Sequence, residues 1–180
     1  MTFRLAPPLA ALMILLLPAQ LPAQSADRTS QVGGLSLSND KPIQIESDNL
    51  EIREQEKRAV FTGNVRVAQG ATTLRAGDMV VYYSAKGGTV SSGKAAIEKI
   101  VVSGKVVLSS GKQNASADRG VFDMKTDVLV LEGKSVVLSE GANVFAGCKL
   151  TVQMKSGLAK LESCGGRVRI QLDPKTQNGN

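Results

Sequence analysis

The 180-residue sequence contains no histidine and no tryptophan, and aromatic residues make up only 3% of it. Without histidine the chain has no Ser-His or Cys-His nucleophile pair and no imidazole metal ligand. These absences argue against an enzyme and against a bound cofactor or metal ion. A carboxylate pair drawn from Asp48, Asp78 and Asp118 is the remaining catalytic alternative, of the kind that β-rich glycosidases use.

Charge of one sign is not concentrated anywhere in the chain. The net charge is +6, but lysine and arginine are interspersed with aspartate and glutamate. A nucleic-acid-binding domain would show a clustered basic face, so we expect no nucleic-acid partner. A mild positive charge suits an anionic headgroup or, as the alternative, general solubility.

Long apolar runs are missing except near the N-terminus. Residues 9–17 form an apolar run of nine residues after Arg4, and a segment rich in Pro, Ala and Gln follows as far as Ala26. This run is shorter than the roughly 20 residues that span a bilayer. The order predicts a secretory signal peptide over residues 1–26, with a retained membrane anchor as the alternative. We expect a flexible linker over 27–40, one β domain over 41–173 and a disordered tail over 174–180.

Cysteine is scarce, and the two residues present are Cys148 and Cys164. Secreted chains enter an oxidising compartment in which disulfides persist, so we predict a bond between them. We predict a hairpin between them that turns at residues 155–157. A three-residue turn places the cysteines opposite each other, whereas a two-residue turn matches the apolar faces better and separates them. A bulge at residues 164–166 would reconcile the two, and two separate thiols are the alternative.

What the sequence does contain is an internal repeat of strands. An acidic residue or cysteine precedes an apolar residue by four positions in four units, whose starts lie 30, 40 and 30 residues apart. The four pairs are Asp48/Ile52, Asp78/Tyr82, Asp118/Phe122 and Cys148/Val152. An insertion at residues 84–94 explains the long middle unit, and we expect it to be a flexible loop. The recurring aspartates are predicted to accept hydrogen bonds from nearby backbone N–H groups.

Each unit has a second half that begins with glycine and alternates apolar with polar residues. The second halves begin at Gly63, Gly104, Gly133 and Gly166. Alternation with a period of two predicts strands with one buried face, and glycine at regular steps predicts strands that bend sharply there. Short polar breaks at 55–57, 125–127 and 155–157 predict hairpin turns. Stacked, bent hairpins form an elongated two-layered structure with apolar residues between the layers.

Five segments carry a resemblance to a known family. They are KPIQIESDNL at 41–50, VFTGNVRV at 60–67, Ala76-Gly77-Asp78 with Val81-Tyr82, VLVLEG at 128–133 and GRVRIQLDP at 166–174. In this order and spacing they resemble the LptA/OstA family of lipopolysaccharide carriers, from Lys41 to about Lys175. The departures are Gly77, which interrupts the usual Ala-Asp pair, and Cys148, which replaces the aspartate that begins the fourth unit.

The resemblance implies an OstA-like β-jelly-roll of V-shaped cross-section, located in the periplasm, whose apolar interior accepts lipid acyl chains. It implies lipopolysaccharide, through its lipid A, as the ligand and places the lipid-contacting positions at Ile43, Ile45, Phe122 and Met124. It also implies head-to-tail self-association into a bridge between an inner-membrane LptC-like protein and an outer-membrane LptD-like protein.

Two strand edges are predicted to mediate this assembly, residues 42–46 and 167–172, because they lie at the limits of the repeat. Pairing there would be β-augmentation, in which main-chain hydrogen bonds supply the affinity. The residues that form these edges are Pro42, Ile43, Gln44, Ile45, Val168, Ile170 and Leu172. Two alternatives stay open: a membrane-anchored partner with the same fold, and a structural β-solenoid module with a fully packed interior.

Overall fold

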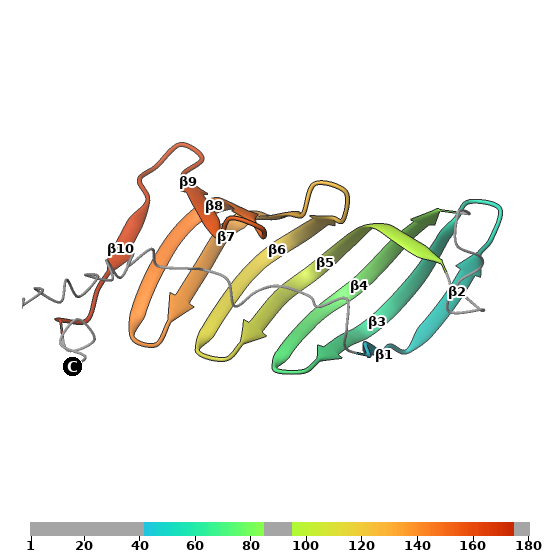
Figure 1. Cartoon of the computed structure of the whole chain (residues 1–180). Coiled ribbons are helices and arrows are strands. Elements are labelled where there is room, and N and C mark those ends of the chain that lie inside the picture. The colour runs from blue at the N-terminus through green and yellow to red at the C-terminus, as the bar shows by residue number, and fades with distance from the viewer. Residues whose placement is uncertain (1–41, 85–94, 175–180) are drawn as a thin grey trace, which may run out of the picture.

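The computed structural model describes residues 42–84 and 95–174 (Figure 1). Within these residues ten strands, all paired antiparallel, form one sheet that stays open at both ends. This confirms the predicted all-β class. The predicted signal peptide over 1–26, the linker over 27–40, nearly all of the loop over 84–94 and the tail from 175 onward lie outside the described residues. No helix long and apolar enough to cross a bilayer occurs in the described part of the chain.

Six long strands follow one another through the sheet, each paired with the next in the sequence. Two short strands pair with the first long strand, and two more pair with the last. The strands are β1 (Gln44–Glu46), β2 (Asn49–Arg53), β3 (Arg58–Gln69), β4 (Thr72–Ser84), β5 (Ala96–Ser110), β6 (Gln113–Asp123), β7 (Val128–Glu140), β8 (Asn143–Gln153), β9 (Leu158–Glu162) and β10 (Arg169–Gln171).

A corner crosses the sheet where the pairing register of every long strand shifts. The shifts fall between Thr62 and Val65, Ser103 and Val106, and Glu132 and Val136, among others. Gly63 and Gly104 have φ angles of 80° and 81°, a conformation that side chains disfavour. The bends predicted at Gly63, Gly104 and Gly133 are therefore confirmed. Gly166 differs, because it lies in the segment between β9 and β10 and not within a strand.

Gly77, the glycine that departs from the family pattern, has a packing role at this corner. A Cβ atom on Gly77 would lie 3.3 Å from the carbonyl oxygen of Ser103, and one on Gly104 would lie 3.2 Å from Cα of Gly77. The backbones of β4 and β5 thus approach so closely that a side chain on either residue would make a tight contact with the neighbouring strand.

The corner folds the sheet so that both halves of each strand contribute to one core. In β3, Ala59 and Phe61 precede the corner and Val65 and Val67 follow it, yet all four belong to the same buried apolar cluster. The alternating burial of these strands supplies the apolar face that the period of two predicted. The interior of the fold is the space between the two halves.

The hairpin turns on one margin are longer than predicted. They span residues 54–57, 124–127 and 154–157, four residues each instead of three. The third turn sets Gln153 opposite Leu158, Val152 opposite Ala159 and Leu150 opposite Leu161. The longer turn therefore keeps apolar residues of both strands on one face, which the three-residue turn would not do. On the other margin the turns have two residues and begin at Gly70, Gly111 and Gly141.

Candidate functional site

Two adjoining apolar clefts open between the halves of the folded sheet. The central cleft has a volume of about 70 Å³, and only apolar side chains and glycine line it, among them Leu74, Val102, Leu108 and Leu129. The second cleft, of about 210 Å³, lies toward the N-terminal end of the sheet. Val67, Met79 and Ile100 line both. The two clefts therefore adjoin, and together they are called the groove below.

A third cleft of about 420 Å³ lies at the C-terminal end of the sheet. Its apolar lining comes from Leu138, Phe145, Leu150, Leu161 and Leu172, with Gln113, Glu140 and Asn143 also present. Apolar clefts thus occur from the first strands of the sheet to the last.

Three of the four predicted lipid-contacting residues line the groove. Ile43 and Ile45 line the N-terminal cleft and are each 40% exposed. Phe122 is half-buried and lines the central cleft. Met124 is the first residue of the turn over 124–127 and is not among the residues that line any of these clefts.

Sequence reasoning missed Met154, which lines the central cleft. It is the first residue of the turn over 154–157, as Met124 is of the preceding one. Both methionines follow their unit starts, Asp118 and Cys148, by the same number of residues. The repeat therefore contained the signal that identifies Met154, although the family resemblance did not point to it.

Among the described residues, Tyr83 brings the only hydroxyl group to the lining of the N-terminal cleft. The hydroxyl donates a hydrogen bond to Oε2 of Glu54 over 2.9 Å. Burial, and after it this hydrogen bond, raises the pKa of the phenol, so the ring stays neutral at physiological pH. Its polar end is satisfied by Glu54 while its ring extends the apolar wall.

The predicted partner edges lie at opposite ends of the sheet (Figure 1). At the N-terminal end, Ile43 and Ile45 belong to the segment containing β1. At the other end, Val168, Ile170 and Leu172 flank or belong to β10, and Ile170 is 59% exposed. Within the described residues, each end thus combines backbone that has no further strand beside it with exposed apolar side chains, which is a template for strand pairing.

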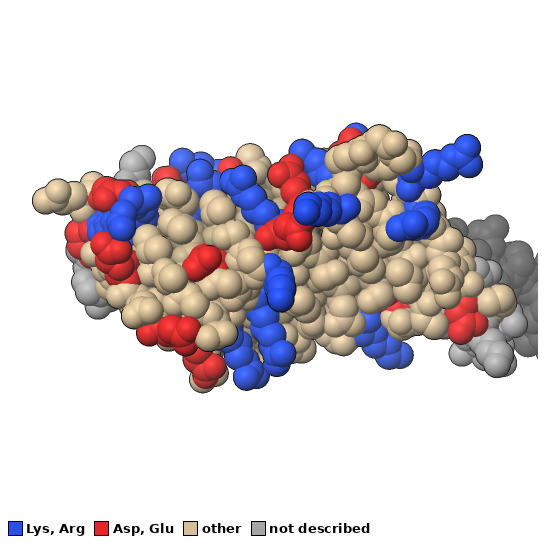
Figure 2. Space-filling model, turned by 180° about the vertical axis from the view of Figure 1, so that it is seen from behind, with Lys and Arg blue, Asp and Glu red and all other residues tan. Residues whose placement is uncertain are grey.

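Charged residues are arranged as pairs and not as a single patch. Figure 2 shows acidic and basic side chains side by side over the back of the molecule, with broad uncharged areas between them. Nζ of Lys149 lies 2.9 Å from Oε1 of Glu132, which raises the pKa of the lysine, and Lys160 lowers the pKa of Glu162. Within the described residues, no group of three or more Cys, Asp and Glu could hold a metal ion.

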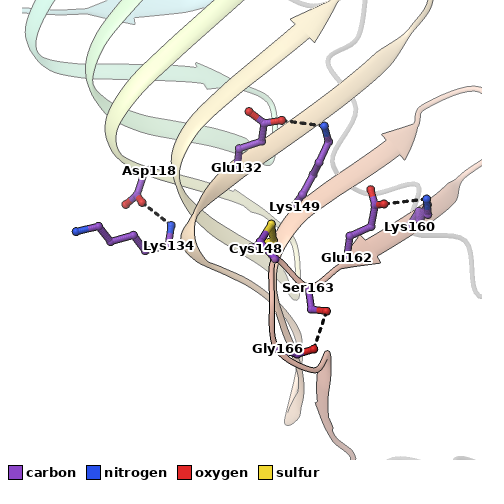
Figure 3. The surroundings of a disulfide bond; sticks show 10 residues. Asp118, Glu132, Lys134, Cys148, Lys149, Lys160, Glu162, Ser163 and Gly166 are labelled. Carbon is purple, nitrogen blue, oxygen red and sulfur yellow. Dashed lines mark hydrogen bonds and ion pairs between the residues drawn. A yellow bond between two sulfur atoms is a disulfide. The ribbon is translucent and has the colours of Figure 1, made fainter.

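The recurring aspartates lie at the corner, on the exposed side of the sheet, and none of them lines the groove. Oδ2 of Asp48 accepts a hydrogen bond from Nδ2 of Asn64 over 2.8 Å. Oδ2 of Asp118 accepts one from the backbone N–H of Lys134, also over 2.8 Å (Figure 3). Both donors lie on the neighbouring strand. The donor to Asp118 is a backbone N–H group, as predicted, whereas the donor to Asp48 is a side-chain amide. These contacts give Asp48 and Asp118 a structural role at the corner.

The structure joins Cys148 and Cys164 in a disulfide, with 5.8 Å between their Cα atoms (Figure 3). Neither of the turn lengths considered from the sequence is the observed one. With the four-residue turn, β9 ends at Glu162, and Cys164 lies beyond it where the chain bends. The bend at 164–166 replaces the predicted strand bulge. It lets the apolar faces match and still brings the two sulfur atoms together.

Residues 44–158 match the model of a family described as LptA/(LptD N-terminal domain) LPS transport protein. The chain belongs to this family. The LptA/OstA resemblance found in the sequence is thereby confirmed. The protein, an open sheet with an apolar interior, thus belongs to a family of lipopolysaccharide transport proteins.

Two proteins are similar to different lengths of this chain. An uncharacterized protein of Rhizobium meliloti (strain 1021), R00383, is 55% identical over 174 residues, which cover 95% of this chain and 94% of that protein. An uncharacterized Rhizobium etli protein, encoded in the 5' region of an rpoN-linked probable transport protein, is 71% identical over 45 residues, covering 25% of this chain and 83% of that protein.

The fold is also that of a protein of known structure. The crystal structure of LptH, the LptA homologous periplasmic component of the lipopolysaccharide transport device of Pseudomonas aeruginosa, superposes with a TM-score of 0.62 at 17% identity. The match covers 74% of this chain and 96% of LptH. It shows a shared fold.

Proposed function

We propose that this LptA-family protein is a non-enzymatic periplasmic carrier that shields the acyl chains of lipopolysaccharide on their way from the inner to the outer membrane. The observation that carries the proposal is the groove, whose central part is lined, among the described residues, only by apolar side chains and glycine. The description of LptH as a periplasmic transport component supports the location.

The physical basis is the cost of exposing acyl chains to water. Burying one methylene group contributes about 0.8 kcal/mol, and lipid A carries several acyl chains. A groove that covers these chains leaves sugars and phosphates in water, where they are well solvated. Because no polar group lines the central cleft, the lipid meets similar surfaces along the groove and can slide without a strongly preferred position.

In this proposal Ile43, Ile45 and Phe122 contact acyl chains directly. Met124, which lies in the hairpin turn over 124–127, contacts the acyl chains at the rim of the groove. Met154 also contacts them, because it lines the central cleft. Unbranched methionine side chains adapt to ligands of variable shape, which suits flexible chains.

The carrier works in a line with proteins of the same fold. The N-terminal edge around β1 and the C-terminal edge around β10 would pair with copies of this chain, with an inner-membrane LptC-like protein and with an outer-membrane LptD-like protein. Main-chain hydrogen bonds would supply affinity and the alternate apolar side chains would supply register. The chain has no nucleotide-binding motif, so the energy for transport comes from a partner.

Photo-crosslinking in cells tests the proposal. A photoreactive residue at Ile45 or Phe122 should capture lipopolysaccharide, because both residues line the groove. Val107 is the matched control, since it is apolar and 40% exposed like Ile45 but does not line the groove. Lys57 and Lys125, in the turns, provide polar controls. Equal capture at Ile45, Phe122 and Val107 would contradict the carrier function.

A further inference from the structure

Three contacts at the corner occupy equivalent places in the repeat. Each joins the first residue of a unit to the residue 16 positions later: Asp48 to Asn64, Asp118 to Lys134 and Cys148 to Cys164. The first two contacts are single hydrogen bonds, and the third is covalent. The cysteine pair therefore replaces a polar contact at a position where the fold already connects two neighbouring strands.

The last strand of the C-terminal edge is weakly attached, as β1 is at the other end, where it pairs with β3 through three residue pairs. β10 pairs with β8 through only three residue pairs, which begin with Arg169 opposite Ala146. Residues 163–168, between β9 and β10, are exposed and belong to no strand. Within this connection Ser163 Oγ donates a hydrogen bond to the carbonyl oxygen of Gly166, a bond that does not reach β8.

The disulfide anchors this connection beside the place where β10 begins. Cys148 lies two positions from Ala146, the residue that faces Arg169. Only residues 165–168 then separate the covalent anchor on Cys164 from β10. A shorter connection that starts next to its target restricts the positions β10 can reach. The anchor also holds the end of β9, so the connection cannot lengthen by fraying of that strand.

We propose that the Cys148–Cys164 disulfide is the covalent equivalent of the Asp48–Asn64 and Asp118–Lys134 hydrogen bonds and that it holds β10 in register on β8. The C-terminal edge is then already ordered as a strand before a partner binds. The partner is an extended edge strand with alternating apolar residues, such as that of β1 in a second copy of this chain. This choice of partner rests on the proposed function. Preformed order matters because a strand that must first be ordered binds more weakly.

Hydrogen exchange of the full chain tests the proposal, with and without a thiol reductant. In the oxidised protein, a peptide covering residues 166–173 should be protected at the β10 amides, and reduction should accelerate their exchange by at least about tenfold. Amides of β3 to β6 should remain strongly protected after reduction, which separates loss of the edge from loss of the fold. Unchanged protection of β10 after reduction would overturn the proposal.

Two double variants test whether a polar contact between positions 148 and 164 can partly replace the disulfide. C148D/C164N recreates the Asp48–Asn64 pair at the last corner and should restore part of the β10 protection that C148A/C164A loses. If the two variants exchange equally fast, the disulfide is not an equivalent of the polar contact, and that part of the proposal fails.

Sedimentation of the oxidised and reduced protein tests the docking role. Reduction should lower self-association in parallel with the loss of β10 protection. Loosening of β10 without any change in association would overturn the docking role. Absence of self-association in the oxidised protein would instead contradict the head-to-tail assembly of the proposed function, while the exchange result would still decide whether the disulfide orders β10.

Discussion

The two ends of the sheet have the same arrangement of strands, but hydrogen bonds close the break in the edge strand at one end and a disulfide closes it at the other. At each end the edge strand is broken at the corner into two short strands, β1 and β2 at one end and β9 and β10 at the other. The N-terminal break comprises Ser47 and Asp48, and the backbone N–H of Asp48 donates to the carbonyl oxygen of Gly63 over 2.9 Å. The C-terminal break spans residues 163–168 and is closed by the disulfide.

The shorter break is closed by hydrogen bonds and the longer break by a covalent bond. A two-residue break leaves the strand close to its neighbour, so the hydrogen bonds of Asp48 suffice, each contributing about 1 kcal/mol. A longer break leaves more freedom to the chain, and closing it requires a stronger constraint. A disulfide that closes a loop of about 15 residues contributes about 3 kcal/mol in the chain-entropy model.

Removing the C-terminal edge should have the largest effect. Deletion of residues 167–180 should abolish self-association and binding to the outer-membrane partner, because it removes β10 and exposes β8. Sedimentation would measure the association, and circular dichroism would verify that the remaining sheet is folded. Oligomers unchanged by the deletion would show that the C-terminal edge is not the contact.

Loss of the disulfide should have the next largest effect. C148S/C164S should lower the free energy of unfolding by about 3 kcal/mol, measured by denaturant titration under oxidising conditions. In the wild-type protein, thiol labelling after denaturation without reductant should find no free thiol. Two free thiols per chain would contradict the covalent closure of the C-terminal break.

Loss of the polar contact at the other end should have the smallest effect. Asp48→Ala removes the acceptor for Asn64 and should lower the free energy of unfolding by about 1 kcal/mol. Asp118→Ala, which removes the equivalent contact inside the sheet, is the matched comparison. If Asp48→Ala destabilised the protein as much as loss of the disulfide, the length of the break would not explain the difference between the ends.

The candidate site could be predicted only in part. Ile43, Ile45 and Phe122, which alternation and family resemblance placed on the same face, line the groove, and their contact with lipid stays a prediction. Met124 was assigned by the same resemblance, but the observed turn begins one residue earlier than the predicted one and contains it. Met154 was not identified, although it occupies the same place in the repeat as Met124, because the family resemblance did not point to it.

By itself the sequence determined that the chain forms strands, where they bend, and that one face of them is apolar. These properties follow from alternation and from glycine, which act on neighbouring residues. Only the tertiary structure decided the turn lengths, the pairing of Leu150 with Leu161, and the meeting of Cys148 with Cys164 beyond the end of β9. The reason is that register is chosen by which apolar faces can be buried together, and that choice involves residues from both halves of the folded sheet.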